Sequence, residues 1–64
     1  MSFGNKLLLL RTSYEMSQTE LGEKIGVTKQ MVSRYEKDLD TPSIGVLRLI
    51  AQVFDCTTDS LINE

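Results

Sequence analysis

Histidine is absent from this sequence of 64 residues, and cysteine and proline occur once each, as Cys56 and Pro42. Without histidine the chain lacks the commonest general base and the commonest metal ligand. Catalysis by a Ser–His or Cys–His pair and zinc ligation by histidine are therefore excluded. One cysteine cannot form an internal disulfide and fits a reducing compartment. The sequence predicts neither an enzyme nor a protein that holds a metal or another cofactor.

Long apolar runs are missing as well. The run Leu7–Leu10 has only four residues, too few for a signal peptide or a membrane span. Seven basic against nine acidic residues give a formal net charge of −2, and the apolar share of 41% is ordinary for a soluble globule. A chain this short is one domain at most, since it buries only about 60% of its unfolded surface. We expect a soluble, cytoplasmic domain over residues 1–64.

Helical patterns run through the chain, and no segment alternates convincingly enough for a strand. Phe3, Leu7, Leu10 and Tyr14 recur at intervals of four, three and four residues, which places them on one stripe of a helix. Further helices are indicated by residues that can cap their first turns: Ser17 (with Glu20 completing a capping box), Thr28, Ser43 and Thr57. The predicted fold class is all-α, a compact domain of five short helices.

A very short connection joins the second and third predicted helices. Only Ile25-Gly26-Val27 separates them, and Gly26 can end a helix in the left-handed conformation that other residues avoid. Two short helices joined in this way cross steeply, which predicts a helix-turn-helix over about 17–36 with its second helix at about 28–36. Gly22 stands in the middle of a helix, where glycine is unfavourable. We expect a close approach of the next helix to explain it.

The third predicted helix has a polar face without an evident internal partner. If Val32 points inward, the helical period puts Gln30 and Arg34 almost opposite it. Arginine can bind guanine, and glutamine adenine, through two hydrogen bonds each. Exposed polar faces are common on helices, so the face alone is weak evidence for DNA binding. The tight turn and the paired capping signals strengthen that interpretation.

Two long segments carry a family resemblance. "MSQTELGEKIGVTKQMVSRYE", residues 16–36, and "TPSIGVLRLIAQVFDCTTDSLI", residues 41–62, resemble the Cro/C1-type helix-turn-helix family of bacterial and phage regulators, also called the XRE family. With Leu7, Leu10 and Arg11 the resemblance covers nearly the whole chain. It implies a lambda-repressor-like fold and a sequence-specific transcriptional regulator. Its partner would be double-stranded DNA, bound by a homodimer at a pseudo-palindromic operator. A repressor is the expected form, with activation as the alternative.

The resemblance also implies residue roles. It places Gln18 on a phosphate and against the recognition helix, Lys37 on a phosphate, and Arg11 and Glu36 in an ion pair between the first and third helices. The residues implied to face the major groove are Thr28, Lys29, Gln30, Met31, Ser33 and Arg34.

This chain departs from the family pattern at three positions. Gly22 stands where alanine is usual, and Asp38 where a helix-ending glycine is common. Asp38 and Asp40 also bring two negative charges to a loop expected near the DNA backbone, which disfavours phosphate contacts from that loop.

Leu8 and Leu9 fall off the apolar stripe of the first helix, so we expect at least one of them to be exposed. Isolated surface leucines are common. The alternative is a contact with a second subunit or with a protein partner, as in an antitoxin-like module that chiefly binds another protein. Cys56 is expected to be a small core residue.

Overall fold

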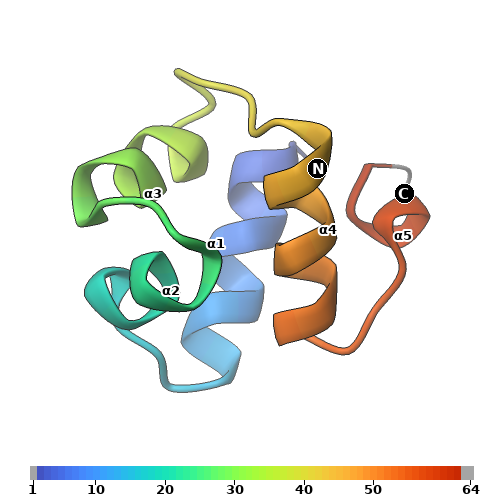
Figure 1. Cartoon of the computed structure of the whole chain (residues 1–64), viewed down its shortest axis with the longest axis horizontal. Coiled ribbons are helices and arrows are strands. Elements are labelled where there is room, and N and C mark those ends of the chain that lie inside the picture. Colours follow the sequence, from blue (N-terminus) through green and yellow to red (C-terminus); the bar gives the residue numbers. More distant parts are fainter. Residues whose placement is uncertain (1, 63–64) are drawn as a thin grey trace.

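The computed structural model describes residues 2–62, which contain five helices and no strand (Figure 1). The helices are α1 (Phe3–Ser13), α2 (Gln18–Ile25), α3 (Lys29–Glu36), α4 (Ile44–Val53) and α5 (Thr58–Ile62). The expected all-α class with five helices is confirmed for this part of the chain. Met1, Asn63 and Glu64, which end the predicted 1–64 domain, lie outside the described residues.

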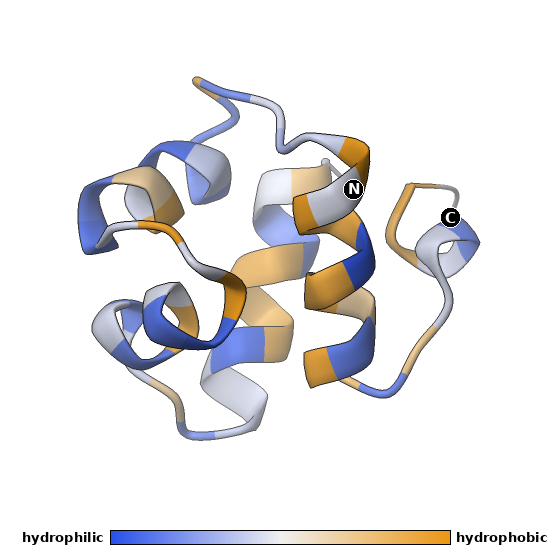
Figure 2. Cartoon of the chain, viewed as in Figure 1, coloured by the Kyte–Doolittle hydropathy of each residue, from blue (hydrophilic) through white to orange (hydrophobic). Residues whose placement is uncertain are grey.

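The five helices pack around one apolar core. α2 packs against α3 and α4, while α1 packs against α3 and α5, and α4 also contacts α5. Figure 1 shows α2 and α3 together on one side of the molecule and α5 on the other. Figure 2 shows mostly hydrophilic ribbon on α2 and α3 and apolar bands on α4. Every helix contributes to the buried apolar residues: Leu7, Leu21, Ile25, Val32, Tyr35, Ile50, Ala51, Phe54 and Leu61.

All four capping residues expected from the sequence cap helices. In the capping box of α2, the Glu20 amide donates to Ser17 Oγ and the Ser17 amide donates to Glu20 Oε1, both at 3.0 Å. Thr28, Ser43 and Thr57 each accept from the amide three residues further on. Each cap satisfies an amide that the helix leaves without an internal partner. These local bonds set the residues at which α2 to α5 begin, including the start of α3.

The stripe predicted for α1 is buried only in part. Leu7 is fully buried and Phe3 and Leu10 are half-buried, but Tyr14 is exposed. The prediction failed at Tyr14 because α1 ends at Ser13 and the tyrosine follows it. Its hydroxyl donates to the Phe54 carbonyl at 3.1 Å, and its ring meets the Phe54 ring edge-on at 5.0 Å. Tyr14 therefore closes the edge of the core rather than filling it.

Left-handed residues end four of the helices. Gly26 follows α2 with φ 77°, as its sequence position predicted. Glu15, Asp38 and Asp55 take the same conformation after α1, α3 and α4, with φ between 52° and 59°. A side chain in this conformation costs about 1–2 kcal/mol relative to the right-handed helical region. Three helix ends therefore carry a strain that a glycine would remove.

Two glycines allow elements to approach closely. A Cβ at Gly22 would lie 2.6 Å from the Val27 carbonyl oxygen, so the expected close approach exists, although the connecting turn rather than α3 itself makes it. A Cβ at Gly4 would lie 2.5 Å from the Glu36 carbonyl oxygen. The first turn of α1 thus rests directly on the end of α3. Among residues 2–62, no helix is both long and apolar enough to cross a bilayer.

Candidate nucleic-acid interface

Helix α3 has one face in the core and the opposite face in solvent. Val32 is fully buried and Tyr35 nearly so. Gln30 and Arg34 are exposed, as the helical period predicted from an inward Val32. In this orientation the side chains of Gln30 and Arg34 project from the surface, and both can form paired hydrogen bonds with base edges.

The residues around Gln30 and Arg34 differ in how much they expose. Lys29 and Lys37, at the two ends of α3, are exposed. Thr28 is exposed too, while its hydroxyl oxygen accepts from the Met31 amide at 3.2 Å. Ser33 and Met31 are half-buried, and Met31 packs against the core. The outer face is therefore formed mainly by long polar side chains, and Met31 contributes only part of its surface.

Glu36 joins three helices beneath this face. Its carboxylate accepts from Arg11 Nε at 2.5 Å, from Arg11 Nη2 at 3.2 Å and from Gln18 Nε2 at 2.9 Å. Arg11 Nη1 donates to the Met16 carbonyl at 2.8 Å. The Arg11 and Glu36 side chains are only 13% and 6% exposed. The ion pair between α1 and α3 is thus part of the structure, and Gln18 braces α3 through the same carboxylate. Charge-assisted bonds of this kind are the strong ones.

A second ion pair lies at the surface, between Arg34 Nε and Asp40 Oδ2. The hydrogen bond and the charge of Asp40 raise the pKa of Arg34. This pair was not predictable from the helical pattern, because Asp40 stands six residues after Arg34 and beyond the end of α3. The only sign of such a pair in the sequence was the presence of two acidic residues, Asp38 and Asp40, in the "KDLD" loop.

The local charge of α3 is positive although the whole chain carries a net charge of −2. No acidic residue occurs from Val27 to Tyr35. Glu20 and Glu23, on the neighbouring α2, are exposed. The bonds from the Ser17 amide and hydroxyl lower the pKa of Glu20. Contact with a phosphate depends on such local charge, whereas the net charge governs solubility and long-range steering.

A family model described as Helix-turn-helix matches residues 7–61. This chain belongs to the Cro/C1-type helix-turn-helix family. It is 32% identical over 63 residues to the HTH-type transcriptional activator BcrR of Enterococcus faecalis, an alignment that covers 98% of this chain and 31% of BcrR. The chain thus spans about a third of that relative's length.

Solved structures of other helix-turn-helix proteins share the fold. The P22 c2 repressor, solved with a synthetic operator, superposes with a TM-score of 0.95 at 22% identity and covers 98% of this chain and 96% of that one. At this identity the likeness concerns the fold alone. SinR, described as the master regulator for biofilm formation and solved with DNA, has a TM-score of 0.83 at 33% identity and covers 92% of this chain and 95% of that one.

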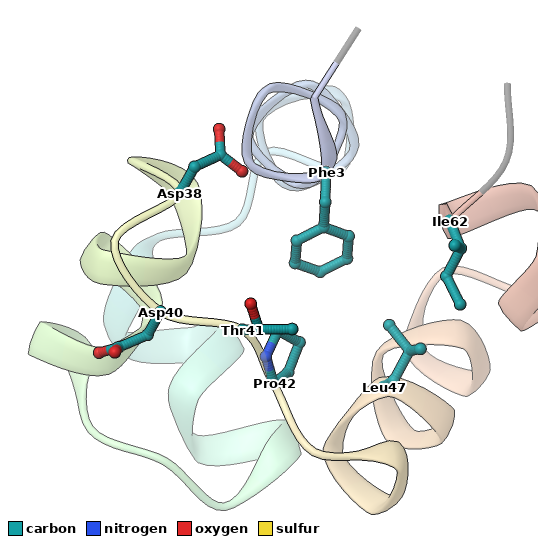
Figure 3. A pocket seen from close by; sticks show the side chains of 7 residues that line it. All are labelled: Phe3, Asp38, Asp40, Thr41, Pro42, Leu47 and Ile62. Atoms are coloured by element: carbon teal, nitrogen blue, oxygen red, sulfur yellow. The ribbon is translucent and has the colours of Figure 1, made fainter.

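This helix-turn-helix domain also has a hollow of about 270 Å³ beside the loop that follows α3. Figure 3 shows the Phe3 ring, Leu47 and Ile62 turned toward one another, while the Asp40 carboxylate points away from Phe3. The lining of the hollow is mainly apolar. Among residues 2–62, no group of His, Cys, Asp or Glu side chains is placed to hold a metal ion. The hollow therefore offers packing space rather than polar chemistry.

Proposed function

We propose that this chain is the DNA-binding module of a transcriptional regulator and that it docks α3 in the major groove of double-stranded DNA. The observation that carries the proposal is the pair of exposed side chains, Gln30 and Arg34, opposite the buried Val32. The name of BcrR, a transcriptional activator, and the SinR structure with DNA support the same function. An α-helix fits the major groove, where each base pair presents a distinct pattern of donors and acceptors.

The proposed roles follow the exposure of each side chain. Gln30 and Arg34 read base edges, and Lys29 and Lys37 contact phosphates, which set the register but carry no sequence information. Gln18 has one amide hydrogen engaged by Glu36, which leaves its second amide hydrogen for a phosphate. Smaller contributions to the groove face come from Thr28, Met31 and Ser33.

A single recognition helix contacts too few base pairs for genomic specificity. We therefore propose that the regulator binds as a homodimer to a pseudo-palindrome whose half-sites lie about one helical turn, roughly 34 Å, apart. Occlusion of a promoter in the cytoplasm would make it a repressor. Activation is the alternative, which the name of BcrR favours.

Selection of bound duplexes from a random DNA pool tests this function. The expected result is a pseudo-palindromic sequence that binds more tightly than random DNA. An Arg34→Ala variant should lose about 1–3 kcal/mol of binding free energy and relax the preference at one base pair. Failure to enrich any sequence, together with no binding of any duplex at low salt, would reject the function.

Lys37 provides a separate test of the phosphate contacts. Lys37→Ala should weaken the binding of all duplexes alike and reduce the slope of log affinity against log salt by about 0.9, since one fewer counterion is released. Arg48→Ala, which removes an equal charge from the exposed surface of α4, is the matched control. Equal slopes for both variants would remove Lys37 from the phosphate contacts.

Leu8 and Leu9 are both exposed on α1, in keeping with the alternative of a contact with a second subunit or a protein partner. We propose this contact as an addition to DNA binding. A Leu8→Glu, Leu9→Glu double variant should then weaken self-association or partner binding. Unchanged association and unchanged operator affinity would reject it.

A further inference from the structure

Asp40 lies in the loop between α3 and α4, beside the proposed base-reading arginine. Its Oδ2 accepts from Arg34 Nε, and the two side chains are 38% and 50% exposed. Exposed ion pairs stabilise a fold by less than about 1 kcal/mol, so the pair has little value as a structural brace. The Arg34–Asp40 pair lies on the candidate DNA-binding face, where it can instead affect what Arg34 contacts.

The loop backbone, and not the ion pair alone, holds Asp40 near Arg34. The Leu39 amide donates to the Arg34 carbonyl at 2.9 Å, which turns the chain back at the end of α3. Asp38 takes a left-handed conformation, and its carboxylate accepts from the Gly4 amide of α1 at 2.9 Å. Asp40 stands two positions after Asp38. These contacts of the loop backbone favour a position of the Asp40 carboxylate near Arg34 independently of the ion pair.

The guanidinium group can meet a partner along two edges. One edge presents Nε with one terminal nitrogen, and the other presents the two terminal nitrogens. Asp40 occupies Nε of Arg34, so the edge with both terminal nitrogens is the one left free. That edge matches the O6 and N7 acceptors of guanine, which accept two parallel hydrogen bonds from arginine.

Asp40 also changes what Arg34 prefers to contact. A guanine edge is neutral, whereas a phosphate is an anion and is repelled by a carboxylate nearby. Part of the Arg34 charge is already balanced by Asp40, as the raised pKa of the arginine reflects. A phosphate contact therefore loses more from the presence of Asp40 than a guanine contact does.

We propose that Asp40 is a positioning residue that directs Arg34 toward guanine and away from phosphates, and thereby raises sequence specificity at the cost of general affinity for DNA. This proposal rests on the proposed function, in which Arg34 reads a base. It differs from that function in assigning specificity to a residue that touches neither a base nor a phosphate.

Three variants separate this role from a general charge effect. Asp40→Asn and Asp40→Ala remove the carboxylate. Asp55→Asn removes an equal charge from an exposed residue after α4, where asparagine tolerates the left-handed conformation. Binding is measured by fluorescence anisotropy over a salt series with three probes: the selected duplex, its variant with the guanine facing Arg34 replaced, and a random-sequence duplex.

The wild-type chain should discriminate against the replaced guanine by roughly 5- to 150-fold, the range of one bidentate contact. Both Asp40 variants should lower this ratio at least about threefold and bind the random duplex more tightly, with a salt slope steeper by up to about 0.9 as Arg34 becomes available to a phosphate. Asp55→Asn should leave the ratio unchanged. In an Arg34→Ala background, Asp40→Asn should change neither the ratio nor the slope.

The proposal would be overturned if both Asp40 variants kept the wild-type discrimination ratio and the wild-type salt slope while Arg34→Ala relaxed the preference at one base pair. An effect of Asp40→Asn that persists without Arg34 would overturn it too, because Asp40 would then act only as a negative charge. If Arg34→Ala relaxes no base pair, the base-reading role of Arg34 fails first and the role of Asp40 fails with it. A purely structural role would shift the unfolding temperature without changing the ratio.

Discussion

Glu36→Gln is expected to destabilise the domain by about 3 kcal/mol. Removal of one partner from a buried ion pair costs about 3–5 kcal/mol, because the other charge stays buried without compensation. Here Arg11 keeps 13% and Glu36 6% exposure, and glutamine can still accept one hydrogen bond. Both facts place the cost at the lower end of the range.

This loss is large for so short a chain. Stability of about 0.05–0.15 kcal/mol per residue gives 64 residues a total of about 3–10 kcal/mol. At about 4–8 °C per kcal/mol for a domain of this size, the unfolding temperature should fall by about 12–24 °C. Thermal unfolding followed by circular dichroism measures the shift.

Glu23→Gln, the same substitution at an exposed position of α2, is the control and should change stability by less than about 0.5 kcal/mol. Replacing both Arg11 and Glu36 by methionine should recover most of the loss, since no charge is then buried alone. A Glu36→Gln variant that melts within about 4 °C of the wild-type chain would refute the argument that Glu36 holds the three helices together.

Four further predictions concern helix ends, one close packing contact and pH. Glu15→Gly should raise stability by about 1 kcal/mol in urea unfolding by relieving a left-handed side chain. Asp38→Gly should gain less, because it also removes the hydrogen bond from the Gly4 amide; equal gains would show that this bond contributes nothing. Gly4→Ala should lower stability by about 1–3 kcal/mol, since its Cβ would press on the end of α3, and an unchanged unfolding midpoint would contradict this contact. The pKa of Glu20 is lowered by bonds from Ser17, so its contribution is present above its ordinary value near 4.5 and is lost as the pH falls through the lowered folded value. Glu20→Gln, which removes the titrating group, should therefore flatten the fall of stability on acidification, and an unchanged pH profile would show that Glu20 is not a source of that fall.

The sequence predicted what is decided by neighbours along the chain. Ser17, Thr28, Ser43 and Thr57 cap helices through residues three positions further on, so their roles can be recognised without a tertiary structure. The inward direction of Val32 followed from helical period in the same way. The five helices and the face of α3 were therefore predictable.

Contacts between distant segments were not predictable from those patterns. The Gly4 amide meets the Asp38 carboxylate across 34 positions of the chain. Asp40 meets Arg34 only because the loop turns back after α3. No periodicity or spacing encodes either contact, since the first depends on how α1 lies against the end of α3 and the second on how the loop turns after α3. The Arg11–Glu36 pair, which joins residues 25 positions apart, was predicted instead from the family resemblance.

The contact between Gly4 and Asp38 has a practical consequence for handling the protein. Because it anchors the first turn of α1 beside the loop that carries Lys37 and Asp40, a peptide fused to the amino end would emerge close to the candidate DNA-binding face. A basic affinity tag there would add its own charge to every salt titration. Binding measurements therefore call for a cleavable tag or for one attached beyond α5.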